Sequence, residues 1–178
     1  MNERRGNTFR LTFCAMMCAL GVVLLYLGSV IEVIDIAAAA MASLLAVLVV
    51  IEYGGAWPWT VYAVTSLLSL ILLPAKLPAL MYALFFGFYP ILKEKIESKC
   101  RKVTQWVFKE LVFHASLIML LLLSRLFLTE DVFGGVIELV VIFVALSEVA
   151  FVLFDIAMTR MISFYVYKLR GRFRLGRK

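Results

Sequence analysis

The fold is decided by the stretch Phe133 to Arg160, which reads GGVIELVVIFVALSEVAFVLFDIAMTR from Gly134 onward. It is long enough to cross a bilayer, because a membrane-spanning helix needs about 20 mostly apolar residues. The stretch also carries four charged residues, Glu138, Glu148, Asp155 and Arg160. Such charges are costly inside a membrane and normally face a bundle interior, a partner or a water-filled cavity. We therefore expect a central helix that the rest of the chain shelters.

Glu148 is the most deeply placed of these charges. It lies fourteen residues past Gly134, about 21 Å along the axis at about 1.5 Å per residue, which is well inside a hydrocarbon layer about 30 Å thick. Asp155 follows seven residues later and, at about 100° per residue, returns to within about 20° of the same face. The two carboxylates are predicted to share one stripe of the helix.

The composition is that of an integral membrane protein. Of 178 residues, 64% are hydrophobic and only 17% are charged, and the mean hydropathy is +1.00, whereas soluble domains are about half apolar. The apolar segments have the length of helices rather than of barrel strands. The fold class predicted is all-α, a single domain (1–178) with six transmembrane helices at about 11–31, 36–51, 57–73, 78–92, 111–128 and 136–158.

The fourth of these predicted spans is short. Pro78 suits its first turn. Pro90 lies within its last turn, where a proline is expected to kink the helix or to end it at Tyr89.

The Lys and Arg residues predict the orientation. Nearly all of them lie before the first span, in the segment Lys93 to Lys109, and in the basic tail 168–178. By the positive-inside rule these three regions, and both termini, are cytoplasmic in a multi-pass protein of the cell membrane. The segment Lys93 to Lys109 mixes charged and apolar residues and suits a helix on the inner membrane surface. The tail is interpreted as an anchor to membrane lipids rather than as an RNA-binding segment, so no nucleic acid is expected as a partner.

Few features indicate chemistry. Cys14, Cys18 and Cys100 form no disulfide framework, and a single histidine, His114, makes a histidine-based metal site unexpected. No phosphate-binding glycine loop, metal-ligand spacing or nucleophile elbow is present. We expect no enzyme activity, no metal and no cofactor.

The first span carries a pair of small residues. It reads LTFCAMMCALGVVLLYLG from Leu11, with Ala15 and Ala19 four residues apart and Gly21 close by. A small-xxx-small pair lets another helix approach closely. Packing inside the bundle is the other interpretation of this pattern.

At these residues the chain resembles the substrate-binding S components of energy-coupling factor (ECF) vitamin transporters, small six-helix bacterial membrane proteins with an AxxxA motif in their first helix. The run LLPAKLPALMYALFFGFYPILK, from Leu72 to Lys93, also looks like the middle of S-component-like proteins. The resemblance implies that the Ala15 and Ala19 face docks on a membrane scaffold subunit driven by two ATPase subunits. It also implies that a vitamin-like small molecule is captured in a cavity that opens outward.

The resemblance directs attention to polar side chains in the outer halves of spans four to six. The candidate ligand-binding residues are Glu148, Arg125, Glu138, Lys76 and Tyr82. Arg125 and Glu138 could instead pair with each other or reach the interface. Glu148 could be a structural carboxylate bonded to Ser116, Ser124 or Tyr62, and Tyr82 could simply pack in the core rather than stack on a flat ligand.

A second polar group is expected at the inner ends of spans five and six. Glu110 and His114 lie one turn apart, at about the depth of Asp155 and Arg160. We interpret these four residues as an inner polar clamp. A proton relay through His114 is the alternative.

Three functions remain open at this point. The first is the substrate-capture subunit of an ECF-type uptake transporter. The second is a structural scaffolding protein similar to the rod-shape-determining family. The third is a small lipid-handling or secondary transport protein that uses Glu148 and Asp155.

Overall fold

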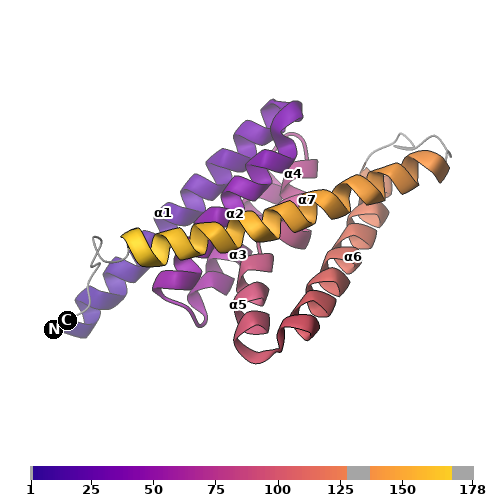
Figure 1. The fold of residues 1–178 in the computed structure, drawn as a ribbon. Coiled ribbons are helices and arrows are strands. Elements are labelled where there is room, and N and C mark those ends of the chain that lie inside the picture. The colour runs from indigo at the N-terminus through magenta and orange to yellow at the C-terminus, as the bar shows by residue number, and fades with distance from the viewer. Residues whose placement is uncertain (1, 128–136, 170–178) are drawn as a thin grey trace. The chain divides into compact units, whose positions relative to one another are not determined.

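The computed structural model describes residues 2–127 and 137–169, and every element in these two stretches is a helix (Figure 1). The predicted all-α class is confirmed. The chain divides into two compact units, Met1–Phe127 and Leu128–Lys178. The first unit contains α1 (Asn2–Val30), the 3-10 turn η1 (Glu32–Ile34), α2 (Asp35–Glu52), α3 (Trp57–Leu72), α4 (Leu77–Met81), the π-helical turn η2 (Tyr82–Phe86), α5 (Tyr89–Lys99) and α6 (Lys102–Phe127). The second contains α7 (Ile137–Phe164) and the π-helical turn η3 (Tyr165–Leu169).

Four helical segments of the described chain are long and apolar enough to cross a membrane. They are Asn7–Val30, Asp35–Glu52, Lys102–Leu123 and Val141–Lys168. A span needs about 20 apolar residues, and α3 is apolar but has only 16. The predicted first, second, fifth and sixth spans therefore correspond to helices of spanning length, while the third and fourth correspond to shorter or interrupted helices.

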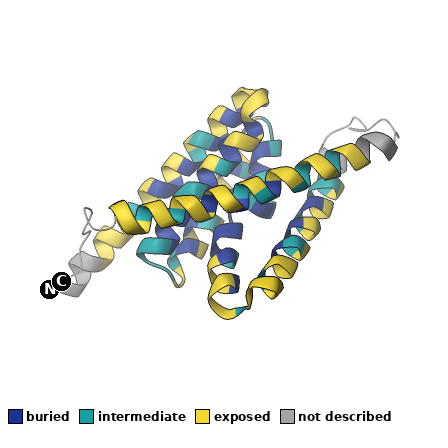
Figure 2. Cartoon of the chain, viewed as in Figure 1, coloured by how far each residue is buried: buried dark blue, intermediate teal, exposed yellow. Residues whose placement is uncertain are grey.

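Small residues bring α1 close to α2 and α3. A Cβ added to Gly28 would lie 2.6 Å from the Cβ of Ala38, and one added to Gly21 would lie 3.2 Å from Cγ2 of Thr65. Close approach through small side chains is how membrane helices gain packing contacts, since lipid is as apolar as a core. Buried and exposed positions consequently alternate along α1 and α2 (Figure 2).

Two clusters of buried residues fill the interior of the first unit. At the end where α1 stops and α2 starts, the cluster consists of Leu25, Ala39, Ala42, Leu73, Ala79 and Tyr82. Toward the other end of α1, the cluster consists of Cys14, Met17, Cys18, Val49 and Val61. The core of this unit thus joins α1, α2 and α3 along their length.

The predicted fourth span is interrupted before Pro90. Pro78 lies in the first turn of α4, as predicted, but α4 passes into the π-helical turn η2, in which the Gly87 N–H donates to the Tyr82 carbonyl at 2.7 Å. A new helix, α5, then begins at Tyr89 with Pro90 in its first turn. The expectation that a helix kinks at Pro90 or ends at Tyr89 is therefore wrong in position. A proline in a first turn lacks only an N–H that has no intrahelical partner, so Pro90 starts a helix here.

The segment Lys93 to Lys109, predicted as a helix on the inner membrane surface, is a helical hairpin made of the end of α5 and the start of α6. α5 continues to Lys99, and α6 begins at Lys102 after a two-residue turn. Lys93 and Lys109 are only 1% and 4% exposed, so the two ends of this segment are buried rather than on a surface. Long lysine stems can be buried when the ammonium group finds a partner.

The turn between α2 and α3 is tight because it uses two glycines in the left-handed region. Gly54 and Gly55 have φ of +57° and +61°, values that favour glycine. Tyr53 beside them lies edge-on to Phe13, with ring centroids 5.5 Å apart, and 5.8 Å from the guanidinium carbon of Arg10. Burial raises the pKa of the Tyr53 phenol. These contacts attach the start of α1 to the turn.

Candidate functional site

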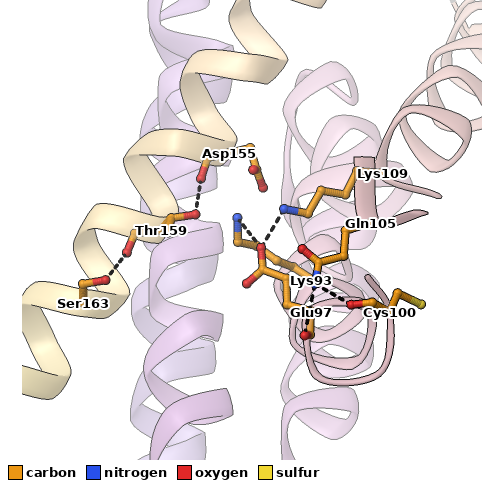
Figure 3. A network of polar contacts seen from close by, with 8 residues as sticks. All are labelled: Lys93, Glu97, Cys100, Gln105, Lys109, Asp155, Thr159 and Ser163. Carbon is orange, nitrogen blue, oxygen red and sulfur yellow. Dashed lines mark hydrogen bonds and ion pairs between the residues drawn. The ribbon is translucent and has the colours of Figure 1, made fainter. Parts of the chain in front are cut away.

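A cluster of three charged side chains joins α5 to α6 (Figure 3). The Glu97 Oε1 atom accepts a bond from Lys109 Nζ at 2.6 Å and pairs with Lys93 Nζ at 3.2 Å. Lys93 and Glu97 lie one turn apart on α5, and Lys109 comes from α6. Because both lysines are buried while the Glu97 side chain is 35% exposed, the carboxylate caps two ammonium groups from the surface side.

Gln105 completes the turn of this hairpin. Its Nε2 atom donates to the Glu97 carbonyl at 3.2 Å and to the Cys100 carbonyl at 2.9 Å (Figure 3). The last carbonyls of a helix lack intrahelical donors, so this side chain satisfies the end of α5 from the first turns of α6. The hairpin is therefore held by both charge and backbone capping.

The first half of the predicted inner clamp is a local pair on α6. His114 Nδ1 lies 3.0 Å from the Glu110 carbonyl and 3.9 Å from Glu110 Oε2. The other half, Asp155 and Arg160, belongs to α7 in the second unit. On that helix Asp155 is 3% exposed, whereas Arg160 is exposed. The clamp as a set of four residues stays a prediction.

The α7 helix presents its carboxylates along one stripe. In the part of α7 whose side chains the structure describes, Phe151, Asp155 and Met158 are the buried residues, at spacings of four and three, and the half-buried Glu148 precedes them on the same face. Thr159 Oγ1 donates to the Asp155 carbonyl and Ser163 Oγ to the Thr159 carbonyl, both at 2.9 Å (Figure 3). These two hydroxyls therefore donate hydrogen bonds to backbone carbonyls of their own helix.

The proposed partners of Glu148 in the first unit have bonds of their own. Ser116 Oγ donates to the Val112 carbonyl at 2.8 Å, and the Tyr62 hydroxyl donates to the Ala83 carbonyl at 2.8 Å. The side chain of Ser124 lies outside the described residues. A structural bond from these groups to Glu148 stays a prediction, as does its role in binding a ligand.

Lys76 acts locally. Its Nζ atom donates to the carbonyls of Leu70 at 2.9 Å and Leu73 at 2.7 Å, and these groups end α3. Cations are favourable at a helix C-terminus, where carbonyls lack partners. The side chains of two other candidates, Arg125 and Glu138, lie outside the described residues.

Tyr82 is a core residue. It is 1% exposed, belongs to the cluster at the end of α1, and has its ring centroid 6.5 Å from that of Tyr62. In this position the ring packs against protein, which favours the packing interpretation over stacking on a ligand.

The docking pair predicted on α1 faces outward. Ala15 and Ala19 are exposed, while Cys14, Met17 and Cys18 on the other side of the helix are buried. No family model, no curated protein and no solved structure matches the chain. The resemblance to S components thus rests on residues such as these, and the exposure of both alanines disfavours internal packing as their role.

The cluster of Lys93, Glu97 and Lys109 was missed in the sequence. The available signal was the i, i+4 pair of Lys93 and Glu97 on a segment that also carries the buried residues Ile91 and Ile96. That pattern indicates a helix with one buried face. The position of Lys109 opposite Glu97 depends on the hairpin.

Proposed function

We propose that the chain is the substrate-binding membrane subunit of an ECF-type uptake transporter, which captures a vitamin-like small molecule on the outer side of the cell membrane. The observation that carries this proposal is the outward-facing pair Ala15 and Ala19 on a helix of spanning length. Small residues on an exposed face leave room for the backbone of a partner helix.

The two faces of α1 support separate tasks. The buried face packs Cys14, Met17 and Cys18 against α2 and α3. The exposed face around the alanines carries the large apolar residues Met16 and Leu20, at 51% and 44% exposure. A partner can therefore be contacted without disturbing the core, as docking on a scaffold subunit with its ATPase subunits requires.

The finer plan of this proposal keeps six spans with both termini cytoplasmic. It is supported by the four helices of spanning length and by the Lys and Arg distribution. In it α3 and the α4–η2–α5 segment cross as shorter, irregular helices. Glu148 is the leading ligand-binding candidate because a half-buried carboxylate in the middle of such a helix is costly without a role.

One observation favours a second candidate, a scaffolding protein similar to the rod-shape-determining family. The interior of the first unit is filled at the end where α1 stops, since Leu25, Ala39, Leu73 and Tyr82 are each at most 1% exposed. A protein that recruits partners without a small ligand needs no cavity there.

The test is coexpression of the tagged full chain with an ECF scaffold subunit and its ATPase subunits from the same organism. Ala15→Leu and Ala19→Leu should each reduce copurification of the scaffold subunit at least about tenfold, because added bulk blocks helix contact. Ala115→Leu is the matched control, since Ala115 is exposed on another long apolar helix, α6. All variants should stay monodisperse.

Two results would contradict the proposal. If all three variants retained the scaffold subunit equally, Ala15 and Ala19 would not form the docking face. Loss of monodisperse folding by the Ala15 and Ala19 variants alone would make the alanines packing residues. A small molecule that copurifies with the chain, identified by mass spectrometry, would distinguish the transport subunit from the scaffold.

A further inference from the structure

The turn between α5 and α6 carries an exposed basic surface. Lys95, Lys99, Arg101 and Lys102 are all exposed, and we call these four residues the hairpin patch. Of the two nearby carboxylates, Glu97 is engaged by the buried Lys93 and Lys109, which leaves Glu94. The accessible charge of the turn is therefore strongly positive.

Large apolar side chains adjoin the hairpin patch on the first turns of α6. Val103, Trp106 and Val107 are 79%, 42% and 60% exposed. Residues three and four apart share a face of a helix, so these three form one apolar strip that begins directly after Arg101 and Lys102. A basic group beside an apolar strip containing tryptophan is typical of a helix end in the interface of a bilayer.

We propose that the hairpin patch and this strip together bind an anionic phospholipid of the surrounding leaflet. The phosphate of the head group pairs with Lys99, Arg101 and Lys102, and the acyl chain lies along Val103, Trp106 and Val107. A soluble anion would use only the basic half, whereas a phospholipid matches both halves. This binding does not depend on the transport function proposed above.

The cluster of Lys93, Glu97 and Lys109 positions this site. It ties α5 to α6 about two turns from the connection at Cys100, and Gln105 donates to the Cys100 carbonyl at that connection. The exposed lysines and the apolar strip are consequently presented from a braced hairpin. Because the hairpin patch and the apolar strip are held in a fixed arrangement, they can bind an anionic lipid at one defined site. This binding adds to the general attraction of basic segments to anionic membranes.

The experiment uses the full chain reconstituted in bilayers and the fluorescence of Trp106. Trp57→Phe and Trp59→Phe leave Trp106 as the only tryptophan. Quenching is measured in phosphatidylcholine vesicles containing phosphatidylglycerol, with bromine on the acyl chains of one lipid or the other at equal total bromine. Brominated phosphatidylglycerol should quench Trp106 more strongly, with half of the maximal effect at a low mole fraction of that lipid.

Neutralising variants then assign the effect to the patch. Lys99→Gln, Arg101→Gln and Lys102→Gln should each raise the half-maximal mole fraction about fivefold, the factor expected for one basic residue near an anionic surface. Arg4→Gln with Arg5→Gln is the matched control and should leave the value unchanged. Raising the salt concentration should weaken the preference, since exposed charges are screened.

Two outcomes would overturn the proposal. One is equal quenching by the two brominated lipids in the parent protein, which would show no preference for the anionic head group at Trp106. The other is an equal loss of preference in the Arg4 and Arg5 control, which would make the effect one of net charge. Circular dichroism of each variant confirms folding, and the salt titration of the parent protein provides an independent measurement should a variant not fold.

Discussion

Glu97 illustrates how one side chain can hold two buried charges. Removing a single partner from a buried ion pair is usually more damaging than never having the pair, because an ammonium group is left in a poorly solvated place. Lys93 and Lys109 both approach the same Oε1 atom. The carboxylate is partly exposed, so solvent weakens each attraction and limits the stabilisation it provides.

We predict that Glu97→Ala lowers the free energy of unfolding by about 2 kcal/mol, less than the about 3–5 kcal/mol of a fully buried broken pair, because Glu97 is partly solvated. Glu94→Ala is the control, since Glu94 is exposed on the same helix, and it should change stability by less than about 0.5 kcal/mol. Unfolding in detergent, followed by circular dichroism, measures both. Equal effects of the two variants would mean that the cluster contributes nothing specific.

Glu148 provides the second test on a single residue. Glu148→Gln keeps the size and hydrogen bonding of the side chain and removes its charge. If Glu148 helps to bind the ligand, affinity for a small molecule that copurifies with the chain should fall at least about tenfold, or about 1.4 kcal/mol, with a nearly normal melting temperature. Affinity and melting temperature are measured on the same sample. A lowered melting temperature with unchanged affinity would make Glu148 a structural carboxylate.

Among the helical elements, the π-helical turn η2 interrupts the apolar segment between α4 and α5. A π turn is usually found where a helix is locally disturbed for a reason. Here the wider turn places Gly87 against aromatic rings from α3 and from η2 itself, and the Tyr62 hydroxyl donates to the Ala83 carbonyl within it. The turn is therefore supported from the neighbouring helix.

We predict that Gly87→Ala destabilises the protein by about 2 kcal/mol or more, because overpacking in a full core typically costs about 1–3 kcal/mol. A Cβ at this position would lie 2.6 Å from Tyr62 Cδ2 and 2.9 Å from the Tyr82 carbonyl oxygen. Gly21→Ala is the comparison, since its nearest contact is 3.2 Å, and it should cost clearly less. Melting temperatures of purified variants decide the order, and a harmless Gly87→Ala would mean that the turn adapts.

For the complete chain, the orientation in the membrane is the prediction with the widest consequences. Cys100 and a cysteine introduced at Lys178 should be shielded from impermeant thiol reagents in intact cells, whereas one introduced at Glu130 should react. Cys14 and Cys18 are only 5% and 8% exposed and should contribute little background. Permeabilised cells serve as the control, in which Cys100 becomes accessible. Reaction of both Cys100 and position 178 from outside would show the opposite orientation. It would also contradict a ligand site that opens to the outer side.

Local sequence was enough to predict the helical class and the position of most helices. The expected spans at 11–31, 36–51, 111–128 and 136–158 each overlap, in the described residues, with a long helix, α1, α2, α6 and α7. Apolar runs of this length have essentially one stable arrangement in lipid, because a helix satisfies its own backbone hydrogen bonds. The positions of these helices along the chain therefore follow from the distribution of apolar residues.

The candidate site was predicted less completely. The common stripe of Glu148 and Asp155 could be derived, because helical periodicity alone places residues seven apart on one face. The local roles of Lys76 and Tyr82 could not, since they depend on where α3 ends and on what surrounds η2. Likewise, the mixture of charged and apolar residues from Lys93 to Lys109 indicated a surface helix. The burial of the two end lysines depends on the α5–α6 hairpin and could not be derived from that pattern.

Sequence and tertiary structure thus account for different properties of this protein. Length and hydropathy, which are sums over neighbouring residues, decided that it is an all-α chain with helices long and apolar enough to span a membrane. Which face of each helix is covered depends on elements distant in sequence, so only the packed structure decided that Ala15 and Ala19 face outward while Lys93 and Lys109 are buried around Glu97. The physical reason is that apolar character is carried by single residues, whereas burial and ion pairing require a second element to be in place.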